Sequence, residues 1–124
     1  MMQFDPVANG QHLSRLFDCC VAVGKTITRF GNSFQIFESD KNFQYSIAFA
    51  IWQIRGLSGE LPPEYCKTTE DRVRWEQIKV LGNRILHDYD NVDNADIWQT
   101  ATTDIPALKG FCEEELAKAR QESR

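Results

Sequence analysis

The chain has little positive charge. It contains 14 lysines and arginines against 18 acidic residues, which gives a formal net charge of −4 over 124 residues. A surface that binds nucleic acid broadly needs many more basic than acidic side chains, so this composition excludes a protein that coats nucleic acid over its whole surface. Any contact with RNA or a nucleotide must come from a small local site, or from a site that pairing of two chains assembles.

Long apolar runs and an export signal are also missing. No stretch approaches the roughly 20 apolar residues that a membrane-spanning helix needs. The first residues, MMQFDPVANGQ, do not combine a basic segment with a following apolar one. Such a combination is typical of a secretory signal. We therefore expect a cytoplasmic protein with no membrane partner.

The cysteines do not form a metal-binding pattern. No Cys-x2-Cys pair and no Cys/His cluster is present, so we predict no metal site and no cofactor. The sequence also lacks a Gly-x-Ser-x-Gly motif and a glycine-rich phosphate-binding loop. In a cytoplasmic protein the thiols stay reduced, and we predict buried structural thiols. These cysteines are Cys19, Cys20, Cys66 and Cys112.

Helical periodicity is the dominant pattern that the sequence does show. Apolar residues recur at steps of three and four, and no segment shows sustained period-two alternation. We predict an all-α, up-and-down bundle of four to five helices, forming a single domain over residues 1–124. The expected helices cover about residues 9–30, 40–59, 69–87, 95–102 and 105–117, followed by a short charged tail from about Lys118.

Several residues mark the expected helix ends. Gly31 stands where a helix commonly ends in a left-handed residue. Ser39 or Asp40 is expected to cap the second helix, and Thr68 or Thr69 the third. Asp104 is expected to cap the last helix. The pair Pro62–Pro63 breaks the chain, residues 88–94 are rich in turn-forming Asp and Asn, and Pro106 is tolerated in a first helical turn.

A polar cluster lies at the end of the third predicted helix. Asn83 and His87 are four residues apart and share one helix face, with Arg84 at its edge. RNA cleavage without a metal needs a proton acceptor, a proton donor and positive charge on the phosphate, which imidazole and guanidinium groups supply. The alternative is that His87 satisfies free carbonyls at the helix end. Two interpretations of Tyr89 remain open. Its ring packs at the edge of the core, or its hydroxyl contacts substrate or is modified.

Other conspicuous side chains are interpreted as structural. We expect three tryptophans to be packing anchors between helices, namely Trp52, Trp75 and Trp98. His12 is interpreted as a surface residue, because no acidic or cysteine partner lies near it in the sequence. The run of three glutamates at 113–115 is interpreted as a solvated face, although an acidic patch could also meet a basic partner.

The motif Asn-x-x-x-His-x-Tyr, formed by Asn83, His87 and Tyr89, resembles the HEPN superfamily and within it the HepT-like group of minimal chains. The resemblance extends over roughly residues 13–116. Other matching segments are Phe43-x-Tyr45, Ile51-Trp52-Gln53-Ile54, Trp75-x-x-Ile78, His87-Asp88-Tyr89-Asp90-x-Val92-Asp93, Ile97-Trp98 and Asp104-Ile105-Pro106-x-Leu108.

The resemblance implies an all-α homodimer, or a higher oligomer, whose motif helices face each other across a cleft. It implies a metal-independent endoribonuclease that acts as the toxin of a toxin–antitoxin pair. The implied partner is a minimal nucleotidyltransferase antitoxin, which adds AMP to the motif tyrosine. Carried over to this sequence, His87 would be the acid/base, Asn83 the supporting polar group and Tyr89 the modified hydroxyl.

The chain departs from the family pattern at two places. Active members carry Arg-x4-His, but Gly82 stands five residues before His87, and Arg55-Gly56 replaces the Gly-Glu that often follows isoleucine in the second helix. In one hypothesis Arg84 or Arg55, from this subunit or the other, supplies the phosphate contact, and RNA is cleaved through 2′-hydroxyl attack. In the other, the chain is a catalytically silent module that binds a nucleotidyltransferase or a nucleotide.

Overall fold

A computed structural model describes residues 10–122, and within this range it contains helices and turns without a strand. The all-α prediction is therefore confirmed. The expected start of the first helix at residue 9, and the end of the predicted tail at residues 123–124, lie outside the described range. The elements are α1 (Gly10–Arg29), α2 (Phe34–Ser39), α3 (Lys41–Gly59), α4 (Pro63–Thr68), α5 (Trp75–Asp88), the 3₁₀ turn η1 (Tyr89–Asn91), α6 (Asn94–Gln99), the π-helical turn η2 (Thr100–Asp104) and α7 (Ile105–Glu122).

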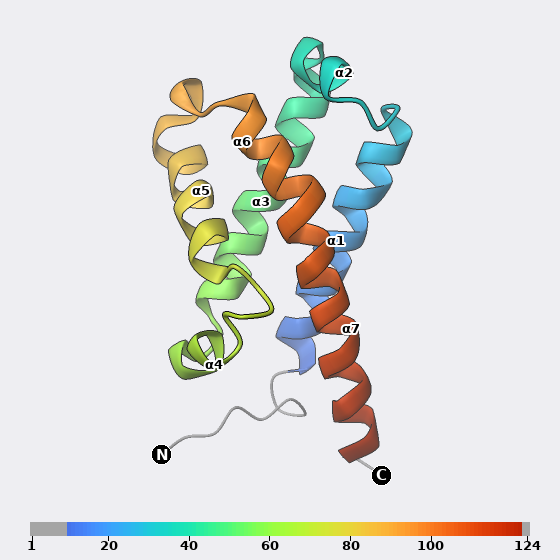
Figure 1. Cartoon of the computed structure of the whole chain (residues 1–124), viewed down its shortest axis with the longest axis vertical. Helices are drawn as coiled ribbons and strands as arrows, with labels where there is room; N and C mark the ends of the chain where they lie inside the picture. Colours follow the sequence, from blue (N-terminus) through green and yellow to red (C-terminus); the bar gives the residue numbers. More distant parts are fainter. Residues whose placement is uncertain (1–9, 123–124) are drawn as a thin grey trace.

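Four long helical segments make up the bundle (Figure 1). The helix α3 lies between α1 and α5 and packs against both, and α7 packs along α1. The elements α6, η2 and α7 continue into one another as a single rod. The short helices α2 and α4, which were not predicted, lie at opposite ends of the bundle. Since α3 and α5 are neighbours, residues far apart in the sequence meet along their contact.

Two predicted helix ends are confirmed. Gly31 and Asn32 have positive φ angles of 100° and 50°, and the Asn32 amide donates to the Ile27 carbonyl at 2.9 Å. This left-handed pair ends α1. Asp40, not Ser39, caps α3, because its carboxylate accepts a hydrogen bond from the Phe43 amide at 3.1 Å.

The predicted start of the third helix at Thr68 or Thr69 is wrong, because α5 begins at Trp75. The Thr69 hydroxyl donates to the Tyr65 carbonyl at 2.7 Å, which closes α4. The same oxygen accepts a hydrogen bond from the Trp75 indole at 2.9 Å. Thr69 therefore ends one helix and positions the first residue of the next, where sequence spacing alone indicated a cap.

Asp104 is not the cap of a separate helix, because it lies within the continuous rod. Its carboxylate is buried and lies 3.7 Å from Nη1 of Arg74. The amide of Ile105 donates to the Thr100 carbonyl, five residues back. Such a π turn is wider than an α turn, and it gives room for the ring of Pro106, which an ordinary helix interior would exclude. The charged residues from Lys118 onward also remain helical as far as residue 122.

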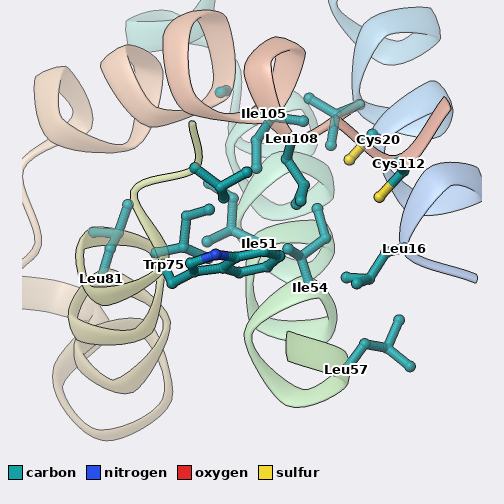
Figure 2. Packing of buried hydrophobic residues seen from close by; sticks show 14 of the residues in the cluster. Leu16, Cys20, Ile51, Ile54, Leu57, Trp75, Leu81, Ile105, Leu108 and Cys112 are labelled. Carbon is teal, nitrogen blue, oxygen red and sulfur yellow. The ribbon is translucent and has the colours of Figure 1, made fainter. Parts of the chain in front are cut away.

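The core is formed by apolar faces of α1, α3, α5 and α7, and Figure 2 shows the Trp75 ring lying among aliphatic side chains of α3. Trp98 packs its ring 5.3 Å from Phe37 and 5.8 Å from Phe43, measured between centroids. Both tryptophans are thus packing anchors, as predicted. The thiols of Cys20 and Cys112 are free and buried, also as predicted, and Figure 2 shows their sulfur atoms side by side; Cys19 and Cys66 are free but only half-buried.

One interpretation of a polar residue is extended and another is wrong. His12 is partly exposed, which agrees with the surface interpretation, and its Nε2 lies 2.8 Å from Oε2 of Glu60, a partner distant in sequence. The glutamate run is not a uniformly solvated face, because Glu115 is buried, accepts a hydrogen bond from the Tyr65 hydroxyl and pairs with Lys118. Sequence spacing could not show either contact. As a separate finding, no helix within residues 10–122 is both long and apolar enough to cross a membrane.

Candidate functional site

The helix α5 carries the motif residues Asn83 and His87 outside its set of buried residues. Its buried residues are Trp75, Ile78, Leu81 and Gly82. His87 is exposed and Asn83, one turn earlier, is half-buried. No hydrogen bond within residues 10–122 engages the His87 ring, so the imidazole is not seen to cap carbonyls at the end of α5. His87 is open to a ligand from solvent.

Asn83 is held by an arginine from the neighbouring helix. Arg55 Nε, on α3, donates to Asn83 Oδ1 at 2.6 Å, across 28 positions of sequence. This bond fixes the amide orientation, because the side-chain oxygen must face the guanidinium. A charge-assisted hydrogen bond of this kind is stronger than one between neutral groups. The guanidinium of Arg55 is therefore held against the motif helix α5, although Arg55 belongs to α3.

Gly82 lies directly against the Arg55 side chain of α3. A Cβ atom built on Gly82 would lie 2.5 Å from Arg55 Cβ and 2.7 Å from Arg55 Cγ. Ordinary carbon contacts are about 3.5–4.0 Å. A side chain at 82 and the present Arg55 conformation therefore exclude each other. This close contact gives a physical reason for the glycine at the family's arginine position.

Arg84 points toward a different partner. Its Nη2 donates to the Asn91 carbonyl at 3.2 Å, and the Asn91 amide donates to Asp88 Oδ1 at 2.7 Å. Successive residues on a helix are about 100° apart, so Arg84 and Asn83 project in different directions. In the described chain, Arg84 holds the η1 turn against α5 and does not contact Asn83.

Tyr89 begins the η1 turn directly after α5 and is half-buried. Its ring lies 5.7 Å from that of Tyr45 on α3, measured between centroids. Burial raises the pKa of the Tyr89 hydroxyl above its ordinary value, and the neighbouring Tyr45 and Asp90 raise it further. The phenol therefore stays protonated at neutral pH, and a base must take its proton if the oxygen is to act as a nucleophile.

Exposed apolar side chains lie on α5, which carries Asn83 and His87, and on the neighbouring helix α3. Tyr45 and Phe49, one turn apart on α3, are 54% and 56% exposed, and Leu86 on α5 is 50% exposed. The ring of Trp52 is half-buried and lies 5.6 Å from that of Phe49. Trp52 thus extends an apolar stripe on α3. Within residues 10–122 its aromatic contact is with Phe49, and it borders a hollow beside Cys19 of α1, so its anchor role stays a prediction. We call Tyr45, Phe49 and Trp52 the α3 stripe.

A cavity of 890 Å³ opens between α3, α4 and the first turns of α5, and Arg55 forms part of its wall. Its lining includes three further basic side chains and two acidic ones: Lys67, Arg74, Lys79, Glu70 and Glu76. Sequence reasoning missed this cavity because α4 was not predicted. No group of three His, Cys, Asp or Glu residues in the described chain is arranged to hold a metal ion.

Comparison with known proteins places the motif in a family context. The profile of the family described as "Ribonuclease HepT-like" matches residues 22–115. The "Probable ribonuclease HepT" of Thermococcus cleftensis is 30% identical over 77 residues, which cover 62% of this chain and 69% of the relative. The "Putative RNase TTE0752" of Caldanaerobacter subterraneus subsp. tengcongensis is 27% identical over 90 residues, 73% of this chain and 80% of the relative. The search of solved structures finds no match.

Proposed function

The chain belongs to the HepT-like ribonuclease family, and on this premise we propose that it is an endoribonuclease that cleaves RNA without a metal ion. The observation that supports this most directly is the exposed His87 beside Asn83, whose amide is oriented by a guanidinium. An imidazole can transfer protons, and a guanidinium can bind the phosphate that is attacked.

In the proposed reaction, His87 takes the proton of the ribose 2′-hydroxyl. The 2′-oxygen forms a bond to the adjacent phosphorus, the bond from phosphorus to the 5′-oxygen breaks, and that oxygen receives a proton. The products are a 2′,3′-cyclic phosphate and a 5′-hydroxyl. In a dimer two copies of His87 would share a cleft, one as base and one as acid. Asn83 would hydrogen-bond the substrate or the imidazole, and Arg84 would support the site by holding the η1 turn.

We propose a homodimer that pairs the α3 and α5 faces of two chains. The α3 stripe and Leu86 leave apolar area in water, and such area is typical of a protein–protein contact. With a net charge of −4, one chain also offers little general attraction to RNA. Pairing across the motif helices would collect the few basic groups near the site into one cleft.

We further propose that the chain is the toxin of a toxin–antitoxin pair whose antitoxin is a minimal nucleotidyltransferase. In this pairing the Tyr89 oxygen attacks the α-phosphorus of ATP, pyrophosphate leaves, and a base on the partner takes the phenol proton. The half-buried position of Tyr89, directly after the motif helix, would place the added AMP beside His87. The bulky group would then block RNA.

The alternative is a catalytically silent module that binds a nucleotidyltransferase or a nucleotide. Gly82 is the observation that favours it, because the family's motif arginine is absent from that position. Loss of a positioned cation from phosphoryl chemistry typically lowers the rate about a hundredfold or more. This alternative predicts a stable complex with the nucleotidyltransferase and no RNA cleavage.

The deciding assay incubates the full-length protein with end-labelled single-stranded RNA in EDTA. The wild type should generate fragments ending in 2′,3′-cyclic phosphate, and His87→Ala should not. His12→Ala is the matched control, since His12 pairs with Glu60 away from the motif and its removal should leave cleavage unchanged. Cleavage that survives in His87→Ala, or that is absent from the wild type, would contradict the ribonuclease proposal.

A second test addresses the partner. Co-expression with a minimal nucleotidyltransferase, if its gene lies beside that of this chain, should increase the mass of the chain by one AMP and relieve growth arrest. Tyr89→Phe should remain unmodified, while Tyr45→Phe, which changes the neighbouring ring, should still be modified. An AMP found on another residue would contradict the role of Tyr89.

A further inference from the structure

We propose that Arg55, on α3, is the phosphate-binding cation of this site. The inference rests on the proposed ribonuclease function and identifies a catalytic residue outside the motif helix. It follows from three observations: the bond from Arg55 to Asn83, the fit of Arg55 over Gly82, and the different position of Arg84.

The bond to Asn83 uses only one part of the guanidinium. Nε donates to the amide oxygen, and within the described chain neither terminal nitrogen has a hydrogen-bond or ion-pair partner. Arg55 also forms part of the wall of the 890 Å³ cavity, beside Lys79 and Val80 of α5, while Asn83 and His87 do not line it. A guanidinium held at one edge keeps its other edge in a fixed direction, ready for two hydrogen bonds to phosphate oxygens.

The contact with Gly82 positions the Arg55 side chain on the motif helix. The Cβ, Cγ and Cδ atoms of Arg55 all lie within 3.0 Å of where a Cβ on Gly82 would stand. The aliphatic part of Arg55 thus covers the surface that a residue at 82 would otherwise occupy. An arginine at 82 would have to start from this same space. In this chain the guanidinium beside the motif helix therefore belongs to Arg55 of α3. An arginine at position 82 would instead supply it from α5 itself.

Arg84 fits the role less well. It is bound to the Asn91 carbonyl, and its direction on α5 differs from that of Asn83 by about 100°. To contact a phosphate beside Asn83, it would have to release the η1 turn that carries Tyr89. The two basic candidates therefore have separate tasks: Arg55 binds the phosphate, and Arg84 holds the turn.

The test compares cleavage of single-stranded RNA by wild type, Arg55→Gln, Arg55→Lys, Arg84→Gln and Arg29→Gln. Arg55→Gln should lose about a hundredfold in kcat/KM. Arg55→Lys should recover part of that loss, because it restores charge without the fork. Arg84→Gln should lose less than Arg55→Gln, and Arg29→Gln, at the exposed end of α1, should match the wild type. Circular dichroism and thermal unfolding establish that each variant is folded.

A reciprocal exchange gives a sharper version of the test. Arg55→Gly alone should lose the same activity, and Gly82→Arg alone should unfold at lower temperature because its Cβ meets Arg55 Cβ. The double variant Arg55→Gly/Gly82→Arg removes the overlap and restores one cation. It should recover both stability and cleavage relative to the two single variants. A double variant no more active than Arg55→Gly would count against the proposed position of the cation.

A binding measurement separates failure of this inference from failure of the proposed function. The probe is a DNA oligonucleotide of the same sequence, which lacks the attacking 2′-hydroxyl. If wild type cleaves RNA and Arg55→Gln cleaves equally well, the inference is overturned while the ribonuclease proposal stands. If wild type does not cleave, the ribonuclease proposal fails. Weaker DNA binding by Arg55→Gln than by Arg84→Gln would then still support a phosphate site at Arg55, and equal binding would overturn it.

Discussion

Replacing Gly82 by alanine should destabilise the protein, although alanine is the better helix former. In a helix interior this exchange normally gains about 1 kcal/mol. At Gly82 the added Cβ would lie 2.5 Å from Arg55 Cβ, about 1 Å inside ordinary carbon contact. Both atoms are close to backbone, so a change of rotamer cannot relieve the overlap, and α3 and α5 must move apart.

Overpacking of this kind typically costs about 1–3 kcal/mol. Gly110→Ala is the matched control, because Gly110 lies within α7 and its added Cβ would have no neighbour within 4 Å. The propensity gain is the same in both variants and cancels in their comparison. We therefore expect Gly82→Ala to be less stable than Gly110→Ala by about 1–3 kcal/mol, or about 4–12 °C in Tm for a chain of this size.

The assay is thermal and urea unfolding followed by circular dichroism. The effect of Gly82→Ala on stability is also measured in two variants in which Arg55 is replaced. With Arg55→Gly the nearest atoms are gone, and the penalty at 82 should vanish. With Arg55→Ala the nearest atom, Cβ, remains, and most of the penalty should persist. Equal stability of Gly82→Ala and Gly110→Ala in the wild-type background would refute the proposed close contact.

Three further predictions concern buried polar groups. Tyr65→Phe removes the hydroxyl that donates to buried Glu115, and should lower the free energy of unfolding by about 1.5–3 kcal/mol in urea titrations; a loss below about 0.5 kcal/mol would contradict this. Burial raises the pKa of Asp104 above 3.8, so the folded state binds more protons and stability falls as pH rises through the window above that value. Asp104→Asn should remove this fall when unfolding is compared at about pH 4 and about pH 7; an unchanged pH dependence would count against it. Burial raises the pKa of Cys112 to about 12, so iodoacetamide should alkylate half-buried Cys66 first in native protein, as peptide mass mapping can show; equal labelling of both thiols would be the contrary result.

Local signals account for most of the fold that the sequence predicted. The three- and four-residue steps, the left-handed Gly31 and the Asp40 cap act within one turn of chain, and each is found as expected. The start of α5 was wrong because Thr69 is bound to Tyr65 and to the Trp75 indole, and the second of these contacts depends on how the chain folds back. A capping residue and a helix-ending residue look alike in sequence.

The candidate site was also predictable from the sequence only in part. Helical spacing placed Asn83 and His87 on one face, and the structure has both on α5. Arg55 was one of two candidates for the cation, and no spacing rule could choose it, since its partner lies 28 positions away. Gly82 was visible as a departure from the motif, but its cause is the approach of α3, which appears only in three dimensions.

The contact between Gly82 and Arg55 also limits how such a chain can diverge. Residues 82 and 55 share one volume, so a chain with arginine at both positions cannot pack as this one does. A lineage that moves its guanidinium from one helix to the other must therefore pass through a chain with small residues at both positions and no cation there. On the proposal that Arg55 binds the phosphate, such a chain would lose activity. Relatives should then fall into two separate groups, each with one arginine and one small residue, and chains with small residues at both positions should be rare.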